Sequence, residues 1–359
     1  MTELVAVTAG IGRGHPEYLR SVLTYLPDVP IVKATGMGWQ IARRLYRLGG
    51  CGGIYTVLYN RLRAGKKPSR LILWSLQSPE LNRLKNTRGM VFTDHPLVSH
   101  LLAPYCPVAY LHGEIAAPPV CAIPNARFIF VPIQNTAERL IAFGVNPDAV
   151  SVTGLVIEPE LLKVAETGFQ SRLQRIASHE PLNIGFFLSG ASPRPHIKAI
   201  LTAARSVLNA RLRPFIFCGV DYKTARLFKK KINCPVYVFP SYSEEATATA
   251  QLLPQIDLFV AATHERTNWA VGLGLPMFAL LPHIGPFAPL NFQFAENQGV
   301  CLPLEDPAKF GSYILTLRTQ GKLLQMAHAG WNKYPINGGP KIAELVRSAL
   351  NTPQLETKL

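Results

Sequence analysis

The chain has 359 residues, of which 48% are hydrophobic and 16% charged, a composition that indicates a folded protein and excludes a disordered one. Its length predicts two domains, because a single hydrophobic core rarely grows beyond about 250–300 residues. Its net charge of +15 indicates an anionic partner, which is a nucleic acid, a membrane surface or an acidic substrate.

No uninterrupted apolar run reaches the length of about 18 residues that a transmembrane helix needs, so none is expected. The first residues lack a basic leader, and we therefore expect no signal peptide. Six scattered cysteines without a C-x-x-C pair match neither a zinc site nor a disulfide framework. They predict reduced thiols in a cytosolic protein.

The first expected strand, residues 4–8, ends in a loop with glycines at three alternate positions, residues 10–14. His15 follows, and a helix is expected to begin near Pro16. Such a loop lets backbone amides approach a ligand, although it also suits an ordinary tight turn. NAD binding is not expected, because the spacing is not G-x-G-x-x-G and no acidic residue clearly ends the next strand. His15 is placed where a general base belongs.

Residues 29–79 contain no Asp or Glu but many basic and aromatic residues. Two amphipathic helices are expected, at 41–48 and 54–62, separated by glycines within 49–53. A basic face beside an apolar face suits an anionic membrane surface. Solvated helices packed on their own domain are an alternative, and nucleic-acid binding lacks a supporting motif. The expected membrane contacts are Trp39, Arg43, Arg44, Arg47, Tyr55, Arg61 and Arg63.

Two later strands of the first half end in histidines, in Thr93-Asp94-His95 and in Leu111-His112-Gly113-Glu114. Ligands bind beyond the carboxyl ends of parallel strands, so these histidines and His15 could line one cleft. They lack the close spacing of metal ligands, and we expect no metal. Structural histidines at turns are the alternative, while Asp94 could orient a histidine or act as a base. The strands expected in this half, after the first, are 31–34, 71–76, 90–93, 108–111, 128–131 and 150–153.

The stretch 155–180 holds two helical pieces, and strands then restart at 183–188, 214–218, 236–239, 258–262, 277–281 and 300–302. Most strands are unbroken apolar runs, which are typical of a buried parallel sheet. The chain is therefore expected to be α/β, with two Rossmann-like domains facing across a cleft. We expect an acceptor-binding domain at 1–157, a linker at 158–180, a nucleotide-sugar-binding domain at 181–335, and a C-terminal helix and tail at 336–359.

Small or aromatic residues follow the first three strands of the second half, and their recurrence indicates a nucleotide cleft. The fourth strand, which begins at Asp257, leads into a polar turn, residues 263–268, and a short helix that ends before Pro276. Amides at the start of that helix, together with Arg266, suit a diphosphate. An ordinary αβ unit is the alternative.

These segments resemble the GT-B glycosyltransferases of family 28, which includes diacylglycerol-glycosylating synthases and the N-acetylglucosaminyltransferase that makes lipid II. The resemblance covers about residues 5–305 and depends on the glycine loop ending in His15, on the strand–helix–strand segment 130–159, and on the order from Asp257 through Gly274-Leu275-Pro276 to Asn291. The family's donor turn is usually glycine-rich, unlike the one here. The acid expected just before Asn291 is absent, and Glu265 would take its place.

The resemblance implies an inverting enzyme that moves a hexose from a UDP-sugar to a hydroxyl of a lipid or membrane-associated acceptor, with no cofactor. The protein would be cytoplasmic, bound peripherally to the inner face of the membrane. His15 or Asp94 would deprotonate the acceptor, while Arg266 and the turn amides stabilise the departing diphosphate. The expected donor-binding residues are Ser189, Gly190, Gly219, Tyr242, His264, Glu265, Arg266, Thr267, Asn268 and Asn291. The expected acceptor-binding residues are Gly12, Gly14, His95, His112 and Glu114.

Three alternatives remain open at this point. A soluble enzyme acting on a small acceptor would need no lipid. A non-catalytic GT-B protein would release no UDP. A sugar-nucleotide epimerase would convert the donor with no acceptor present.

Overall fold

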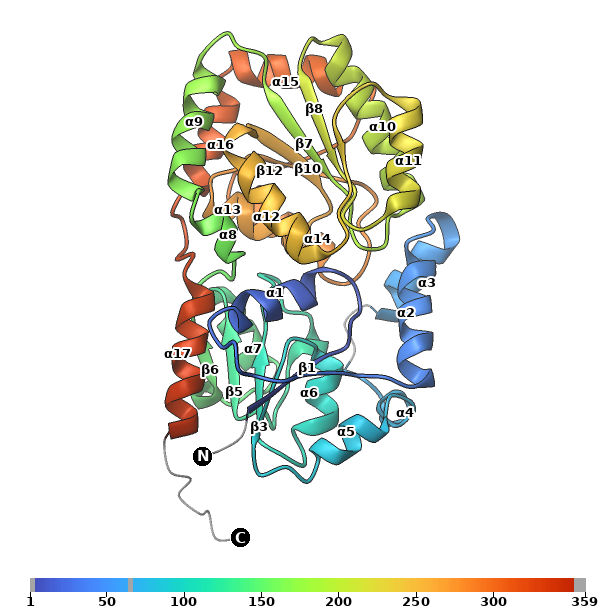
Figure 1. Ribbon diagram of the computed structural model, residues 1–359, viewed down its shortest axis with the longest axis vertical. Helices are drawn as coiled ribbons and strands as arrows, with labels where there is room; N and C mark the ends of the chain where they lie inside the picture. The colour runs from blue at the N-terminus through green and yellow to red at the C-terminus, as the bar shows by residue number, and fades with distance from the viewer. Residues whose placement is uncertain (1–3, 64–66, 352–359) are drawn as a thin grey trace.

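The computed structural model describes residues 4–63 and 67–351, and its strands form two six-stranded parallel sheets (Figure 1). The first sheet has the order β2-β1-β3-β4-β5-β6 and the second β12-β11-β10-β7-β8-β9. The first sheet comprises β1 (Leu4–Thr8), β2 (Ile31–Lys33), β3 (Met90–Thr93), β4 (Val108–Leu111), β5 (Phe128–Val131) and β6 (Val150–Val152). The second comprises β7 (Asn183–Phe187), β8 (Arg213–Phe217), β9 (Val236–Tyr237), β10 (Leu258–Ala261), β11 (Met277–Ala279) and β12 (Cys301–Pro303).

Helices connect successive strands and cover the sheets, as parallel pairing requires. In the first half they are α1 (Gly14–Leu23), α2 (Met37–Gly49), α3 (Gly53–Arg63), α4 (Arg70–Ser75), α5 (Pro79–Leu84), α6 (Pro96–Leu102) and α7 (Gln134–Ala142), with 3₁₀ turns η1 (Pro119–Cys121) and η2 (Pro147–Ala149). Next come α8 (Pro159–Leu162), α9 (Ala165–Ala177), α10 (Arg194–Asn209), α11 (Tyr222–Lys231), α12 (Tyr242–Leu252) and η3 (Leu253–Gln255). The last are α13 (Thr267–Gly272), α14 (Ala288–Asn297), α15 (Phe310–Thr319), α16 (Lys322–Gly330) and α17 (Gly338–Asn351).

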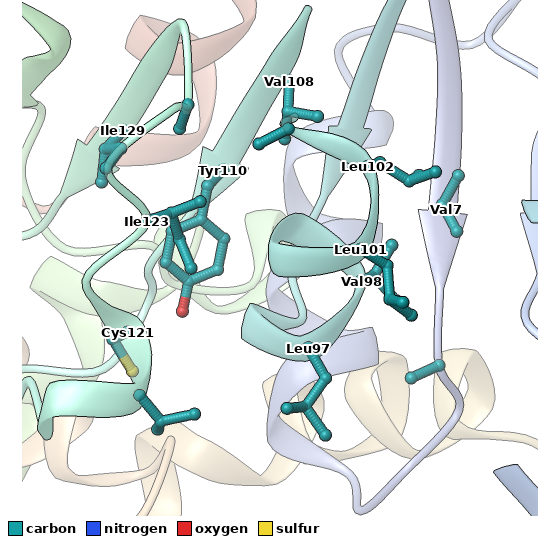
Figure 2. Packing of buried hydrophobic residues seen from close by; sticks show 14 of the residues in the cluster. Val7, Leu97, Val98, Leu101, Leu102, Val108, Tyr110, Cys121, Ile123 and Ile129 are labelled. Carbon is teal, nitrogen blue, oxygen red and sulfur yellow. The ribbon is translucent and has the colours of Figure 1, made fainter. Parts of the chain in front are cut away.

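Most of the apolar runs become strands that are buried on both faces of the sheet. Figure 2 shows one of these faces in the first domain, where Val7, Val108 and Ile129 of the sheet pack with Leu97 and Leu101 of α6. Each such side chain contributes about 1.5–3 kcal/mol when it leaves water. This burial holds the sheet rigid and so fixes where its strand ends, and the loops after them, are placed.

The C-terminal helix α17 returns to the first domain, along which it lies in Figure 1. Ile342 and Val346 of α17 are fully buried in one cluster with Leu19 and Val22 of α1. The end of the described chain therefore stabilises the domain with which the sequence begins.

The strand expected at 71–76 is wrong, because these residues form helix α4. Ser69 caps the helix, its hydroxyl accepting a hydrogen bond from the amide of Ile72 at 3.3 Å. Leu71 and Trp74 of α4 are 73% and 70% exposed. A short apolar run cannot be assigned to strand or helix by its pattern alone.

The expectation that Trp39 contacts a membrane is also wrong. Its side chain is fully buried in the core of the first domain, and its indole nitrogen donates to the carbonyl of Leu76 at 2.7 Å. An indole on an amphipathic helix fits either a core or an interface, because it has an apolar body and one polar donor.

Candidate functional site

Two crevices meet between the domains. The strand order changes direction between β1 and β3 in the first sheet, and between β7 and β10 in the second. Ligands of such sheets bind where this change occurs, beyond the carboxyl ends of the strands. The loops after these four strands line one cavity, whose space, including the part open to solvent, is about 650 Å³. Among its lining residues are Gly12, Arg13, Gly14, His15, His95, Glu114, Ser189, Gly190, His264 and Glu265.

The glycine loop comes very close to the second domain. A β-carbon at Gly14 would lie 3.0 Å from a carboxylate oxygen of Glu265 and 3.5 Å from one of Glu114. Gly12 adopts a φ of +71°, which favours glycine. The loop thus brings the backbone around His15 against the polar turn at residues 263–268 of the second domain.

Four charged residues form a buried cluster across the cleft, which we call the ionic cluster: Arg13, Glu245, Glu265 and Arg266. One oxygen of Glu245 lies 3.1 Å from Arg13 and 3.2 Å from Arg266. Arg266 also pairs with Glu265 at 3.2 Å, and its guanidinium lies over the rings of Phe187 and Trp269. Two cations are therefore concentrated where the domains meet.

Arg13 reaches from the first domain into a small recess of the second. Four of the predicted donor residues line this recess with it: Ser189, Gly190, Gly219 and Tyr242. The guanidinium of Arg13 lies 5.8 Å from the centre of the Tyr242 ring. Sequence reasoning missed Arg13, although it lies inside the glycine loop, and missed Glu245, for which no motif provides a signal.

Burial raises the pKa of Glu245 to about 7, although Arg13 acts in the opposite direction. Burial acts to lower the pKa of Arg13, but Glu245 and Glu265 reverse this effect, and the net shift is upward. The guanidinium thus stays charged, while its carboxylate partner titrates near neutral pH. An anionic ligand that entered the cleft would compete with these carboxylates for both arginines.

His15 lies in the first turn of α1 and lines the cavity. Its ring centre is 5.2 Å from that of His95 and 5.8 Å from that of Phe287. Asp94 is buried, does not line the cavity, and has no hydrogen-bond partner for either oxygen among the described residues. Burial raises its pKa to about 7. His15 is therefore better placed than Asp94 to meet a substrate.

Glu114 lines the cavity as a mostly protonated acid. Burial, and then the neighbouring Glu265, raises its pKa to about 8. Asn291 donates to it at 2.7 Å and accepts a hydrogen bond from the amide of Ala116 at 2.9 Å. Asn291 lies on α14, and it joins the two domains instead of facing the cavity.

Like Arg266, three other predicted site residues do not line the cavity. His112 uses both ring nitrogens, with the Tyr110 hydroxyl at 3.1 Å and the Ala116 carbonyl at 3.1 Å. The amide nitrogen of Asn268 donates to backbone carbonyls of the first domain, including that of Gly113 at 3.2 Å. Thr267 is fully buried. These side chains were predicted to contact a ligand, but the structure places them in packed contacts outside the cavity, within the first domain for His112 and between the domains for Asn268.

The pH dependence of stability offers a test of the state of Glu114. Its pKa is higher folded (about 8) than its ordinary value of 4.5, so the folded state binds the proton more tightly. The free energy of unfolding should fall as pH rises through that window, by at most about 1.4 kcal/mol per pH unit from this group. Glu114→Gln should remove this contribution to the pH dependence. As pH rises from about 5 to about 8.5, the unfolding free energy of the variant should therefore increase relative to that of the unmodified protein.

Denaturant unfolding of both proteins across this pH range measures the difference. Asp94 and Glu245 titrate in the same direction and act equally in both proteins, so only the difference between the two curves reports on Glu114. Parallel curves would show that Glu114 is already ionised in the folded protein.

A large apolar surface lies beside the cavity on helices α2, α3 and α4, which we call the α2–α4 surface. Its exposed large hydrophobic residues are Met37, Ile41, Leu45, Leu48, Ile54, Tyr55, Val57, Leu58, Leu71, Ile72 and Trp74. Arg44, Arg47 and Arg61 are exposed on the same helices, and the side chain of Arg63 lies outside the described residues. A group of exposed apolar side chains on adjacent helices usually marks a binding site for a partner protein or a membrane.

Helix α3 also touches the second domain. The amide nitrogen of Asn60 donates to the carbonyl of His283 at 3.0 Å, and its oxygen accepts from the amide of Gly285 at 2.8 Å. Gly285 lines the candidate cavity. The α2–α4 surface is thus physically connected to the cleft.

Neither a family model nor a curated protein matches this sequence. Solved structures share its fold. S. aureus MnaA, in a co-structure with UDP, has a TM-score of 0.61 at 12% identity over 98% of this chain and 97% of that one. The UDP-GlcNAc 2-epimerase of Neisseria meningitidis, bound to UDP-GlcNAc, scores 0.60 at 15% identity over 98% and 100%.

Acinetobacter baumannii MurG scores 0.56 at 14% identity over 97% of this chain and 100% of that one. Together with the two parallel sheets, these likenesses confirm the expected GT-B architecture of two Rossmann-like domains. Within the described residues, no helix has the length and apolarity needed to cross a bilayer. The same residues contain no group of three or more His, Cys, Asp or Glu suited to a metal ion.

Proposed function

We propose that the protein is a UDP-sugar-dependent glycosyltransferase that moves a hexose, with inversion, to a hydroxyl of a lipid or membrane-associated acceptor. One observation carries the proposal: a single cavity joins the His15 imidazole of the first domain to the Ser189–Gly190 loop and the donor turn of the second. The UDP and UDP-GlcNAc named for the structurally similar proteins support the choice of donor.

In the proposed reaction, the acceptor oxygen attacks the anomeric carbon as the bond from that carbon to the diphosphate oxygen breaks. His15 takes the proton of the acceptor hydroxyl as general base. UDP leaves with the bonding electrons, and its added negative charge is stabilised by Arg266 and Arg13. Both arginines are buried in a low-dielectric site, where charge stabilisation is stronger than in water.

Thermal unfolding with a panel of nucleotides tests the donor site, because a ligand that binds only the folded state raises Tm. We expect UDP and UDP-hexoses to raise Tm and GDP or ADP to leave it nearly unchanged. UDP release in the presence of lipid acceptors then tests transfer. No stabilisation by any nucleotide would favour a non-catalytic GT-B protein.

A specific observation favours a second candidate, sugar-nucleotide epimerisation. Glu114, whose pKa is raised to about 8, and His15 line the same cavity, and both come from the first domain. An epimerase needs such a pair of acid–base groups to remove and return a proton at a sugar carbon. Conversion of a UDP-sugar to its epimer with no acceptor present would establish this function instead.

We assign the α2–α4 surface to an anionic membrane. Its helices combine exposed apolar side chains with arginines, and residues 29–79 contain no carboxylate that would repel an anionic lipid. In the proposed function this surface keeps the cleft close to a lipid acceptor.

Neutralising two arginines of this surface should weaken membrane binding. Arg44→Gln/Arg61→Gln is expected to reduce partitioning onto phosphatidylglycerol-containing vesicles about 30-fold, since each basic residue contributes about 1 kcal/mol. Vesicle sedimentation measures this. The matched control is Arg127→Gln/Arg139→Gln, which makes the same charge change on exposed arginines elsewhere in the first domain. Equal losses in the two variants would contradict the assignment.

A further inference from the structure

A second cavity lies beside the candidate site, and three basic residues contribute to its lining. Lys33 at the end of β2, and Arg43 and Arg47 on α2, line it together with Gly12, Tyr46 and Tyr242. Its space, including its opening to solvent, is about 860 Å³. Among the residues that the structure describes, no carboxylate lines this cavity.

The three cations of this cavity form no ion pair among the described residues. Helices α2, α3 and α4 cannot supply an anionic partner, because residues 29–79 contain no Asp or Glu. Three like charges around one space repel each other unless an anion neutralises them.

Arg43 is held in place by the backbone rather than by an anion. Its guanidinium donates to the carbonyl of Ala9 at 2.9 Å and to that of Ala34 at 2.6 Å. Among the described contacts, Nη1 of Arg43 donates no hydrogen bond. A half-buried cation already fixed in position loses little entropy when it binds a ligand.

The cavity lies between the candidate site and the α2–α4 surface. It shares Gly12, Tyr46 and Gly190 with the cavity that contains His15. Its arginines are on the helix whose Ile41 and Leu45 are exposed. A ligand held here can therefore extend toward His15 on one side and toward a membrane on the other.

We propose that this cavity binds a phosphate group of the acceptor, so that the acceptor is an anionic lipid whose headgroup carries both a phosphate and the reacting hydroxyl. The inference rests on the proposed function and narrows its substrate class, since a neutral glyceride would leave the three cations without a counterion. Guanidinium groups suit phosphate oxygens, to which they donate paired hydrogen bonds.

Soluble ligands test this without interference from membrane binding. Dihexanoyl phosphatidylglycerol below its micelle concentration is compared by calorimetry with dihexanoylglycerol and with inorganic phosphate. The unmodified protein should bind the phosphatidylglycerol and not the neutral glyceride. Lys33→Gln/Arg47→Gln should weaken this binding about 10²-fold, as expected for the loss of two charge-assisted contacts.

The matched control is Arg127→Gln/Arg139→Gln, which loses the same charge from exposed arginines of the first domain outside the cavity, and which should bind the soluble lipid normally. If both variants lose the same affinity for the soluble lipid, the lipid is attracted by the overall positive charge of the protein rather than by this cavity, and the proposal is overturned. Equal affinity for inorganic phosphate and for the lipid would show a site for free phosphate and also overturn it. UDP binding is measured in parallel. A protein that binds the lipid but not UDP would reject the proposed function. A protein that binds UDP but not the lipid would reject only this inference.

Discussion

Replacing His15 with alanine is expected to lower turnover by about 10²–10⁴-fold, the usual contribution of a positioned general base. His15 lines the cavity that both domains share, whereas Asp94 is buried and does not line that cavity. UDP affinity should be nearly unchanged, because the ionic cluster and the Ser189–Gly190 loop remain. Steady-state UDP release, together with UDP binding by calorimetry, separates these two effects.

The matched control is His179→Ala, which removes an exposed histidine near the end of α9, outside the cavity. It should behave like the unmodified protein. Full turnover of His15→Ala would contradict the proposed mechanism. A larger loss in Asp94→Asn than in His15→Ala would transfer the role of base to Asp94.

Replacing Arg266 with methionine is expected to have the largest effect on stability. The change leaves buried Glu245 and Glu265 without one of their cations, and breaking a buried ion pair in this way costs about 3–5 kcal/mol. It should also weaken UDP binding by about 10²-fold or more, since a buried charge contact to an anionic ligand contributes about 2–5 kcal/mol. Denaturant unfolding and calorimetry measure the two quantities.

A double-mutant cycle with Glu245→Gln isolates the ion pair. The double variant should lose less unfolding free energy than the sum of the losses in the two single variants, by about 0.5–3 kcal/mol, because both partners of the ion pair are then neutral. Arg226→Met, on an exposed residue of α11, is the control and should change stability by less than about 0.5 kcal/mol. If Arg266→Met destabilises the protein while UDP binding stays unchanged, the ionic cluster only holds the domains together.

Much of the site could be predicted because the polar loops directly follow apolar strands. His15, His95, Ser189 and Glu265 were each expected at the carboxyl end of a strand, and the structure brings them to one cavity. Arg13 and Glu245 could not be paired in advance, since the residues are 232 positions apart (245 minus 13) and only the packing of the domains joins them.

The wrong predictions have the same cause, because they too depend on contacts that the sequence does not reveal. His112, Asn268 and Asn291 are polar, and their residue types cannot distinguish a ligand contact from a hydrogen bond that only packs the protein. Such bonds lie within the first domain for His112 and between the domains for the two asparagines. Trp39 belongs to an amphipathic helix in either environment, and only the way α2 packs on the core of the first domain decides that it is buried.

The sequence by itself determined the α/β class, the two repeating halves, most strand positions and the basic, acid-free segment, because these depend on local composition and periodicity. The tertiary structure alone decided that α17 returns to the first domain and that Arg13 crosses the cleft. These features depend on contacts between residues far apart in the chain, whose free energy appears only when both partners are buried together.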